Sequence, residues 1–495
     1  MEEVGEHIDQ EPEISLETVK SRAVKGVLAL TGRTFILNAI TLVAQGFLWA
    51  FLAPAEFGLF WIVSAIVNFL VYFSDIGLAA ALIQKKEAPT EDDLKTTFTV
   101  QQILVVLLLV VLVVVTPILK RTYSLTPQGV MLLYALGASF FMSSLKSIPS
   151  VLMERKLEFG KFVIPQVLET FVYNVVIVFF AWKGLGITSF TYSVFIRGLV
   201  GLVAVYLLAP WRPGFAFSKK SLKNLLAFGL PYQLKTFLAV FKDDGMTIVL
   251  GGILGPVGLG LIGMARRWSQ LPLRFFMDNV TKVTFPAFSR MQDDMEHLKR
   301  TVTRSIFFIT FLVFPSVVGI VCLAPVLVRV IPKYEQWLPA LTALTIVSID
   351  TLFGSVTTQL TNLLDATGRI KTTFKLMIMW TVLTLVLVPL LAWKFGVNGA
   401  ALGYALVGVS SVVAIMVARS VIKFSLLESC GKTGIAAGLM GVAILIARRF
   451  LPVTLPSIWV LMGLGGIIYL TGILALVGFS LLGDVKKGIQ ATISK

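Results

Sequence analysis

Apolar runs of about twenty residues recur along nearly the whole chain, and this pattern restricts its fold more than any other feature. A helix needs about 20 apolar residues to cross the hydrocarbon core of a bilayer. Gly and Pro mark the connections between runs, as in Leu52-Ala53-Pro54 and Gly255-Pro256. The runs lie at residues 34–53, 57–83, 96–119, 128–153, 162–182, 186–208, 225–253, 257–288, 305–331, 338–364, 372–393, 396–418, 433–451 and 457–482. They predict an all-α polytopic membrane protein with about 14 transmembrane helices.

The composition agrees with a chain that lies mostly in lipid. Only 14% of the 495 residues are charged, whereas a soluble domain has about 25%. This excludes a soluble enzyme, and a nucleic-acid partner despite the formal net charge of +16. Cys322 and Cys430 are far apart, both histidines lie in charged segments, and there is no GxxxxGK[ST] loop. We therefore expect no metal, no cofactor and no ATP hydrolysis in this chain.

The number of basic residues alternates between high and low from one connection to the next along the chain. The even-numbered connections and the termini, with their flanking residues, hold 27 Lys and Arg, and the odd-numbered connections hold 8. Lys and Arg concentrate on the cytoplasmic side of membrane proteins. The pattern therefore predicts that both termini are cytoplasmic.

A short sequence motif recurs about two hundred residues apart. Residues 52–59 read Leu-Ala-Pro-Ala-Glu-Phe-Gly-Leu, and residues 254–261 read Leu-Gly-Pro-Val-Gly-Leu-Gly-Leu. Both copies follow the first helix of a six-helix block, so the repeat supports two parallel six-helix lobes plus two C-terminal helices. The predicted division is a cytoplasmic arm with an interfacial helix (1–33), an N-lobe (34–208), a cytoplasmic linker (209–224), a C-lobe (225–418) and C-terminal helices 13 and 14 with a tail (419–495).

Charged residues occur inside several runs, where burial in lipid is costly. Away from the ends of the runs, eight are basic and six are acidic. In the eighth run Arg267, Arg274 and Asp278 follow one helical face, with Arg266 about 100° away. So many charges favour a wet cavity, and the basic surplus favours an anionic substrate, since guanidinium binds two phosphate oxygens at once. Helix-to-helix hydrogen bonding and structural ion pairs are the competing explanations.

Three segments resemble the N-terminal part of bacterial Wzx-type polysaccharide transporters, of the multidrug/oligosaccharidyl-lipid/polysaccharide (MOP) superfamily. They are residues 51–59, which contain the first copy of the repeated motif, residues 73–78, which read Phe-Ser-Asp-Ile-Gly-Leu, and residues 81–86. Arg155-Lys156-Leu157-Glu158-Phe159 and Phe228-Gly229-Leu230-Pro231 are similar to connecting elements of that family. The resemblance extends over the whole chain in the number and layout of the runs.

The resemblance implies a flippase, not an enzyme, that moves polyprenyl-diphosphate-linked oligosaccharide of the undecaprenyl-diphosphate type by alternating access in the bacterial cytoplasmic membrane. It implies a cationic cavity for the diphosphate. The matching positions here are Arg33, Lys146, Lys235, Arg266, Arg267 and Arg274. A proton or sodium ion could supply the drive through Asp75, Glu169 or Asp278, and we expect a functional monomer in contact with membrane lipids.

The last two runs are rich in glycine. Their glycines suit either a groove for the lipid tail or close helix packing, and they are Gly434, Gly438, Gly441, Gly463, Gly465 and Gly466.

Two other functions compete with the flippase. A cation-coupled multidrug exporter on the same scaffold would need an acidic or aromatic pocket, which the basic surplus disfavours. A membrane glycosyltransferase or polymerase would need a catalytic acid or a large outer loop, and the longest outer connections have only about ten residues.

Overall fold

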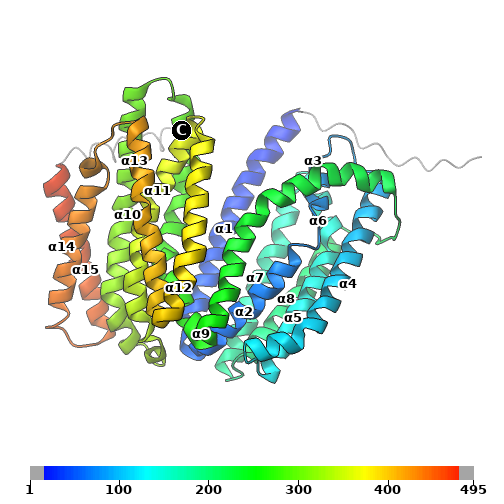
Figure 1. Ribbon diagram of the computed structural model, residues 1–495, viewed down its shortest axis with the longest axis horizontal. Helices are drawn as coiled ribbons and strands as arrows, with labels where there is room; N and C mark the ends of the chain where they lie inside the picture. Colours follow the sequence, from blue (N-terminus) through cyan, green and yellow to red (C-terminus); the bar gives the residue numbers. More distant parts are fainter. Residues whose placement is uncertain (1–15, 479–495) are drawn as a thin grey trace, which may run out of the picture. The chain divides into compact units, whose positions relative to one another are not determined.

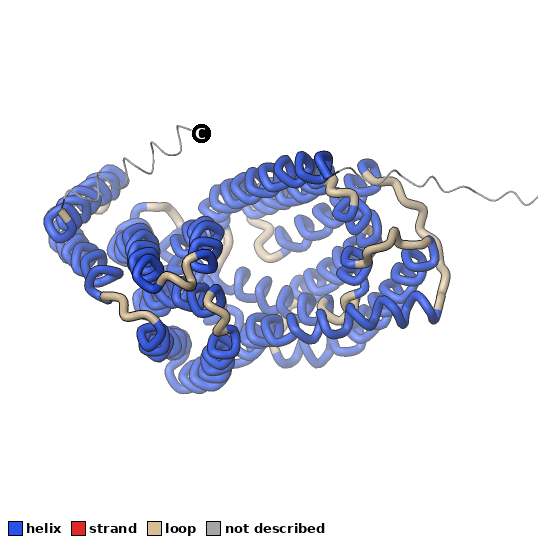
Figure 2. The backbone as a smooth tube through the Cα atoms, turned by 90° about the horizontal axis from the view of Figure 1, so that it is seen from above, coloured by secondary structure: helices blue, strands red, loops and turns tan. Residues whose placement is uncertain are grey.

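The computed structural model describes residues 16–478, in which every regular element is a helix and loops connect the helices (Figure 2). Within that range the side chains of residues 16–31, 35, 232, 234–236, 238, 239, 278 and 279 are not described. The elements are α1 (Leu16–Phe51), α2 (Pro54–Val71), α3 (Leu78–Gln84), α4 (Glu91–Thr122), α5 (Pro127–Leu145), α6 (Ser147–Arg155), α7 (Phe159–Trp182), α8 (Thr188–Leu208), α9 (Lys219–Arg290), α10 (Met295–Val330), η1 (Tyr334–Trp337), α11 (Ala340–Ala366), α12 (Ile370–Ser410), α13 (Val412–Val421), η2 (Leu427–Gly431), α14 (Lys432–Ala447) and α15 (Leu455–Val477).

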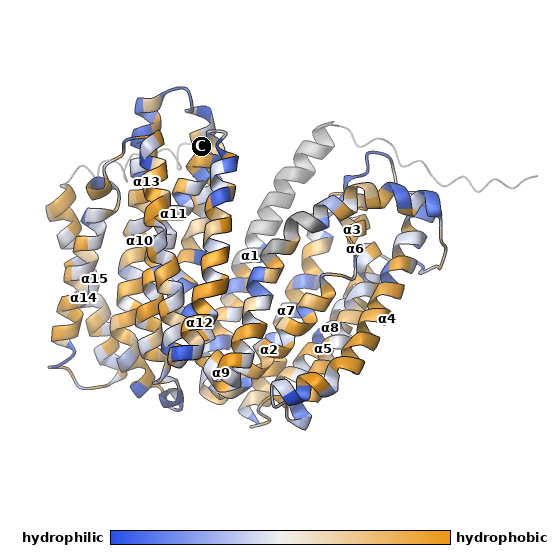
Figure 3. Ribbon diagram, in the orientation of Figure 1, coloured by the Kyte–Doolittle hydropathy of each residue, from blue (hydrophilic) through white to orange (hydrophobic). Residues whose placement is uncertain are grey.

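Twelve helical stretches among these residues are long and apolar enough to cross a membrane. Their outward surfaces are largely apolar, and hydrophilic residues gather at many of the helix ends (Figure 3). Because a bilayer core offers no water to pair with backbone groups, helices that satisfy their own N–H and C=O groups are the form such segments must take. The prediction of an all-helical polytopic membrane fold is confirmed.

Two of these twelve stretches contain a residue with non-helical backbone angles. In α9 it is Gly255 (φ 65°, ψ 179°), and in α12 it is Gly396 (φ 63°, ψ −141°). Glycine adopts positive φ at no steric cost, and Pro256 disfavours helical geometry in the residue before it. Gly255 lies in the connection that the sequence predicts between residues 253 and 257. Gly396 is the first residue of the predicted run 396–418, directly after the predicted connection at residues 394–395.

The second predicted run, 57–83, is not one helix. The helix α2 ends at Val71, a turn follows with positive φ at Ile76 (50°) and Gly77 (77°), and the short α3 begins at Leu78. The Asp75 carboxylate accepts a hydrogen bond from the Ala79 backbone N–H at 3.0 Å. Free N–H groups in the first turn of a helix attract such acceptors, so this polar turn starts a new helix where hydrophobicity alone predicts continuity.

The fourth predicted run, 128–153, is divided at Lys146 into α5 and α6. Pro149 has no N–H to donate to the carbonyl group of Leu145, four residues earlier. The hydroxyl group of Tyr206 in α8 donates to that carbonyl instead, at 2.9 Å. The proline therefore opens the helix at Lys146, and a neighbouring helix satisfies the exposed backbone oxygen.

The chain divides into two compact units, Met1–Leu52 with Val63–Asp244 and Ala53–Ile62 with Gly245–Lys495. The first unit thus contains the first part of α9, and the second contains the first part of α2. The predicted N-lobe (34–208) and C-lobe (225–418) are defined by counting helices and not by contacts between residues. That division stays a prediction.

Glycines allow the backbone to pack closely within each unit. In the second unit Gly58 and Gly260, from the two copies of the repeat, each lie against the proline of the other copy. In the first unit Gly77 and Gly229 lie against each other, so that a Cβ atom on Gly229 would be 2.8 Å from the Gly77 carbonyl oxygen. Two segments that carry the family resemblance, residues 73–78 and 228–231, are therefore in contact.

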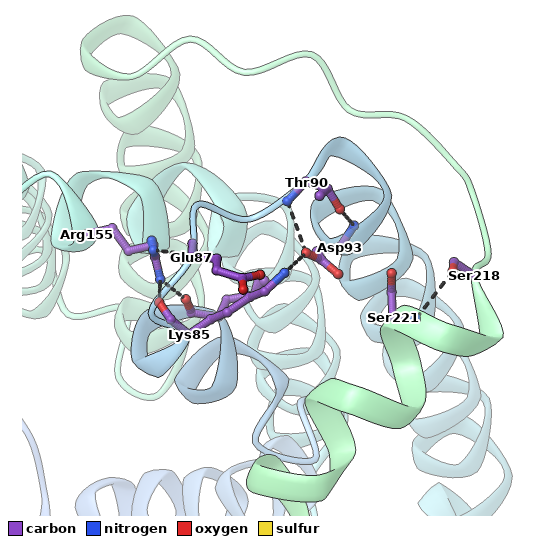
Figure 4. Close-up of polar contacts among 8 residues, drawn as sticks. Lys85, Glu87, Thr90, Asp93, Arg155, Ser218 and Ser221 are labelled. Atoms are coloured by element: carbon purple, nitrogen blue, oxygen red, sulfur yellow. Dashed lines mark hydrogen bonds and ion pairs between the residues drawn. The ribbon is translucent and has the colours of Figure 1, made fainter. Parts of the chain in front are cut away.

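A polar cluster fastens the ends of α3, α4 and α6 (Figure 4). The Arg155 guanidinium donates to the backbone carbonyl groups of Lys85 and Glu87, at 2.7 and 2.9 Å, and also to those of Leu82 and Ile83. The Asp93 carboxylate completes the N-terminal cap of α4 and pairs with Lys85 at 2.5 Å. Orphan carbonyl groups at a helix end need such donors, so Arg155 determines where α3 stops.

In the second unit α14 and α15 lie beside each other and pack on α10 (Figure 1). The Tyr469 hydroxyl donates to the Phe311 carbonyl oxygen at 2.9 Å, and Gly441 lies against Val318. A Cβ atom on Gly438, by contrast, would have no described atom within 4 Å. Part of the glycine-rich sequence therefore serves close packing, and the proposed groove for the lipid tail stays a prediction.

Candidate functional site

A polar cavity of about 360 Å³ lies within the first unit, and we call it the cation pocket. Four parts of the fold build it: α1, Lys146 with the helix α6 that follows it, one face of α7, and α8. Its lining residues are Arg33, Leu37, Lys146, Ser150, Met153, Phe162, Pro165, Gln166, Glu169, Thr170, Arg197 and Val205.

Local sequence explains how the side chains reach this cavity. On α7, Phe162, Gln166, Glu169 and Thr170 are spaced to share one helical face. Lys146 reaches the cavity from the break that Pro149 causes. These positions lie far apart in sequence, and only helix packing brings them together.

Glu169 is the one carboxylate in the pocket lining, and two cations share it. The Lys146 ammonium group pairs with its Oε1 atom, and the Arg197 Nε atom lies 3.6 Å from its Oε2 atom. The side chains of Lys146 and Glu169 are 16% and 10% exposed. The carboxylate sits over Gly201 of α8, where a Cβ atom would overlap it. A buried ion needs a partner of opposite charge. Lys146 and Glu169 therefore depend on each other for charge compensation.

Two polar groups of the pocket lack a partner among the described residues. They are the buried Nε atom of Arg33 and the buried Oε1 atom of Gln166. Buried polar groups are nearly always hydrogen-bonded, because leaving one unpaired costs about 1–3 kcal/mol. An anionic ligand would satisfy the Arg33 donor. With Arg33, Lys146 and Arg197 against Glu169, the lining carries three positive charges and one negative charge.

The structure thus brings three of the predicted site residues together, Arg33, Lys146 and Glu169. Asp75 lies elsewhere in the first unit, where its Oδ1 atom accepts hydrogen bonds from Ala79 N–H and from the Gln101 amide. Asp75 therefore links the start of α3 to Gln101 in the first third of α4.

The predicted arginines of the eighth run lie on the second unit. The Arg266 guanidinium stacks over the Tyr404 ring, 3.9 Å from the ring centroid, and donates to its hydroxyl group at 3.0 Å. Arg274 is exposed and donates to the Gln270 side chain at 3.1 Å, and Arg267 is exposed as well. The side chains of Lys235 and Asp278 lie outside the described part of the structure.

Arg197 is absent from the predicted set of site residues. It lines the pocket opposite Glu169, and its guanidinium carbon lies 5.7 Å from the centroid of the Tyr173 ring. The sequence does contain a signal for this residue, because an arginine within the sixth apolar run is costly in lipid unless it faces a cavity or a partner.

Many apolar helices around a charged internal pocket define a polytopic membrane transporter. Comparison with known proteins then identifies the family. The model of the family described as "Polysaccharide biosynthesis protein" matches residues 47–342, and the chain belongs to that family. The predicted resemblance to Wzx-type transporters of the MOP superfamily, a group of transporters rather than enzymes, is confirmed.

Curated relatives agree with this assignment. The Escherichia coli (strain K12) lipopolysaccharide biosynthesis protein WzxC is 24% identical over 402 residues, 80% of each chain. The Rhizobium meliloti (strain 1021) succinoglycan biosynthesis transport protein ExoT is 24% identical over 315 residues, 63% of this chain and 62% of its own.

A solved structure shows the same fold. The lipid II flippase MurJ in an inward closed conformation has a TM-score of 0.73 at 15% identity, over 92% of this chain and 99% of its own. At that identity the likeness concerns the fold alone.

Proposed function

We propose that this chain flips polyprenyl-diphosphate-linked oligosaccharide across the bacterial cytoplasmic membrane by alternating access, for the synthesis of a cell-surface polysaccharide. The names of the curated relatives, which include lipopolysaccharide and succinoglycan biosynthesis, support a glycan cargo. The cation pocket is the observation that carries the proposal, because its charges suit a diphosphate.

In this proposal Arg33, Lys146 and Arg197 bind the diphosphate oxygens. Hydrogen bonds between ionised groups are about twice as strong as neutral ones. The incoming diphosphate competes with Glu169 for Lys146 and Arg197. A net positive pocket repels cationic drugs, which disfavours a multidrug exporter.

The remaining predicted basic residues act along the rest of the path in the proposal. Arg267 and Arg274 are exposed on a helix that crosses the membrane, where a charge is stable only next to water or a partner. We include Lys235 and Arg266 with them. Glu169, once displaced by the diphosphate, could accept a proton or a sodium ion, with Asp75 and Asp278 as the other candidates.

The proposed topology has fourteen crossings. The twelve helical stretches include two that Gly255 and Gly396 break, and counting their halves separately gives fourteen. An even number agrees with the alternation of Lys and Arg and places both termini in the cytoplasm. We further propose two six-helix lobes with two C-terminal helices, acting as a monomer.

Reconstitution into phospholipid vesicles with a fluorescent lipid-linked oligosaccharide tests the proposal. We expect Arg33→Ala with Lys146→Ala to slow flipping by roughly tenfold or more, since each removes a charged hydrogen bond. Lys183→Ala is the matched control, because Lys183 is an exposed cation that stacks on Trp182 at 4.7 Å, outside the pocket lining. Arg267→Ala with Arg274→Ala tests the second set.

Flipping at the wild-type rate by the Arg33→Ala, Lys146→Ala variant would refute the role of the pocket. Absence of flipping by the wild-type chain, with transport of a cationic dye instead, would refute the function itself.

A further inference from the structure

The connection between α8 and α9, residues 209–218, is fastened to the N-terminal part of α4 within the first unit. The Ala216 backbone N–H donates to the Thr99 hydroxyl oxygen at 3.1 Å. The Ser218 backbone N–H donates to the Thr96 hydroxyl oxygen at 3.0 Å. Backbone N–H groups outside a helix need such acceptors, so these bonds give the connection a defined place on α4.

Aromatic and apolar packing strengthens the same attachment. The ring centroid of Phe98 on α4 lies 5.2 Å from that of Trp211 and 5.7 Å from that of Phe215. Leu225, in the first turns of α9, is buried in the cluster that Phe98 forms with residues of α3 and α6. Figure 1 shows these first turns of α9 beside α3. The connection and the start of α9 therefore form one surface over α3, α4 and α6.

The outward side of this surface carries positive charge. Four basic side chains are exposed and have no acidic partner among the described residues, and they are Arg212, Lys219, Lys220 and Lys223. No acidic residue occurs between residues 209 and 231. Of the three acidic residues in the first turn of α4, Glu91 and Asp93 already pair with lysines of the first unit. A surplus of positive charge therefore remains on the surface.

Two exposed phenylalanine rings lie between these cations in the sequence. The exposed fraction is 75% for Phe215 and 57% for Phe217. Large apolar side chains beside Lys and Arg are typical of segments that lie in the membrane interface, where the rings reach the acyl boundary and the cations stay among the headgroups. The bilayer is close, because the membrane-crossing helix α8 ends at Leu208, four residues before Arg212.

We propose that this surface, the linker patch, binds anionic phospholipid of the inner leaflet. Its residues are Arg212, Phe215, Phe217, Lys219, Lys220 and Lys223. The four cations bind headgroup phosphates, and the two rings enter the boundary between headgroups and acyl chains. The rings favour a lipid over a soluble anion such as a nucleotide, since a small soluble anion would pair with the cations and leave the rings in water.

The proposal goes beyond the cargo and uses only the proposed topology, in which the linker patch faces the cytoplasm. Anionic lipids attract clusters of Lys and Arg that lie just outside a membrane-crossing helix. A zwitterionic lipid offers the same acyl boundary to Phe215 and Phe217 without the net negative charge. The charge of the headgroup is therefore the property to vary.

Photolabelling of the full chain tests the proposal. The protein is placed in phosphatidylcholine nanodiscs that contain a small share of photoreactive phosphatidylglycerol or photoreactive phosphatidylcholine, each with a diazirine at the same upper position of one acyl chain. Labelled peptides are identified by mass spectrometry after irradiation. We expect residues 209–223 to take up roughly fivefold more label from phosphatidylglycerol. High salt should remove this excess, because salt screens exposed charges.

Charge-neutral variants provide the comparison. Lys219→Gln with Lys220→Gln should lower the ratio of phosphatidylglycerol to phosphatidylcholine label from about fivefold to about twofold. Lys120→Gln with Arg121→Gln is the matched control, since it removes two exposed cations at the other end of α4, and it should leave the ratio unchanged. Thermal unfolding in detergent shows whether each variant is folded.

The ring has its own variant. Phe217→Ser keeps every charge and should reduce the label that residues 209–223 take up from both lipids, because the segment loses an apolar contact with the acyl boundary.

Equal labelling of residues 209–223 by the two lipids would overturn the proposal. So would an absence of label there in the wild-type chain, or a ratio in the Lys219→Gln, Lys220→Gln variant equal to that of its control. Flipping is not measured in this experiment, so its outcome does not depend on whether the proposed cargo is correct.

Discussion

Gly58 in α2 lies directly against the backbone carbonyl group of Pro256 in α9. A Cβ atom on Gly58 would overlap the carbonyl oxygen and come within 2.6 Å of the carbonyl carbon. The relationship is reciprocal, because a Cβ atom on Gly260 would overlap the carbonyl oxygen of Pro54. The two copies of the repeat therefore pack in the manner of a symmetric pair within one chain, and a side chain at either glycine would separate them.

Gly58→Ala and Gly260→Ala should each destabilise the protein by about 1–3 kcal/mol, the usual cost of overpacking. Each should lower the midpoint of thermal unfolding in detergent. Gly438→Ala is the control, because its Cβ atom would meet no described atom within 4 Å, and its midpoint should be unchanged or slightly raised. Equal midpoints for Gly58→Ala and Gly438→Ala would contradict the close packing.

Glu169→Gln should weaken folding and strengthen anion binding. The change leaves the largely buried Lys146 without its charged partner, at a cost of about 1–3 kcal/mol, and raises the net charge of the pocket lining. Isothermal titration with inorganic diphosphate should show an affinity roughly fivefold higher.

The control for Glu169→Gln is Glu158→Gln, whose ion pair with Lys161 at 3.1 Å is more exposed. Exposed pairs contribute little, so neither stability nor affinity should change. Unaltered diphosphate affinity in Glu169→Gln would show that Glu169 does not compete with the anion.

Tyr206→Phe should destabilise the break at Lys146 by about 1 kcal/mol, because the Leu145 carbonyl group loses its donor. In a Pro149→Ala background the restored N–H can donate to that carbonyl, so Tyr206→Phe should cost less there. A double-mutant cycle of thermal stability measures this coupling, with Tyr192→Phe at a more exposed tyrosine as the control. Strict additivity of Tyr206→Phe and Pro149→Ala would disprove the link.

Arg155→Lys should loosen the end of α3 although the charge is kept. One ammonium group cannot reach the four carbonyl oxygens that the planar guanidinium contacts. Hydrogen exchange of the backbone amides of residues 78–89 should accelerate roughly tenfold. Arg121→Lys, at an exposed position, should leave those rates unchanged, and protection equal to wild type in Arg155→Lys would refute the clamp.

Sequence alone determined the helical membrane fold and the connections at Gly255 and next to Gly396. Apolar runs of membrane length permit only self-satisfied helices, and glycine and proline mark the breaks. It did not reveal the turn at residues 72–77 or the break at Lys146. Both lie within apolar stretches, and they depend on hydrogen bonds from Gln101 and Tyr206 on other helices.

Sequence also determined which residues within the membrane carry charge, and the face of each helix on which they lie. Only the tertiary structure decided that Arg33, Lys146, Glu169 and Arg197 meet in one pocket, and that Asp75 does not join them. The reason is that helical periodicity fixes only the direction in which each side chain points around its own helix axis, and not which neighbouring helix it faces. In lipid no difference in hydrophobicity selects which helices pair, so the choice rests on close contacts such as Gly201 beneath Glu169, which local sequence does not specify.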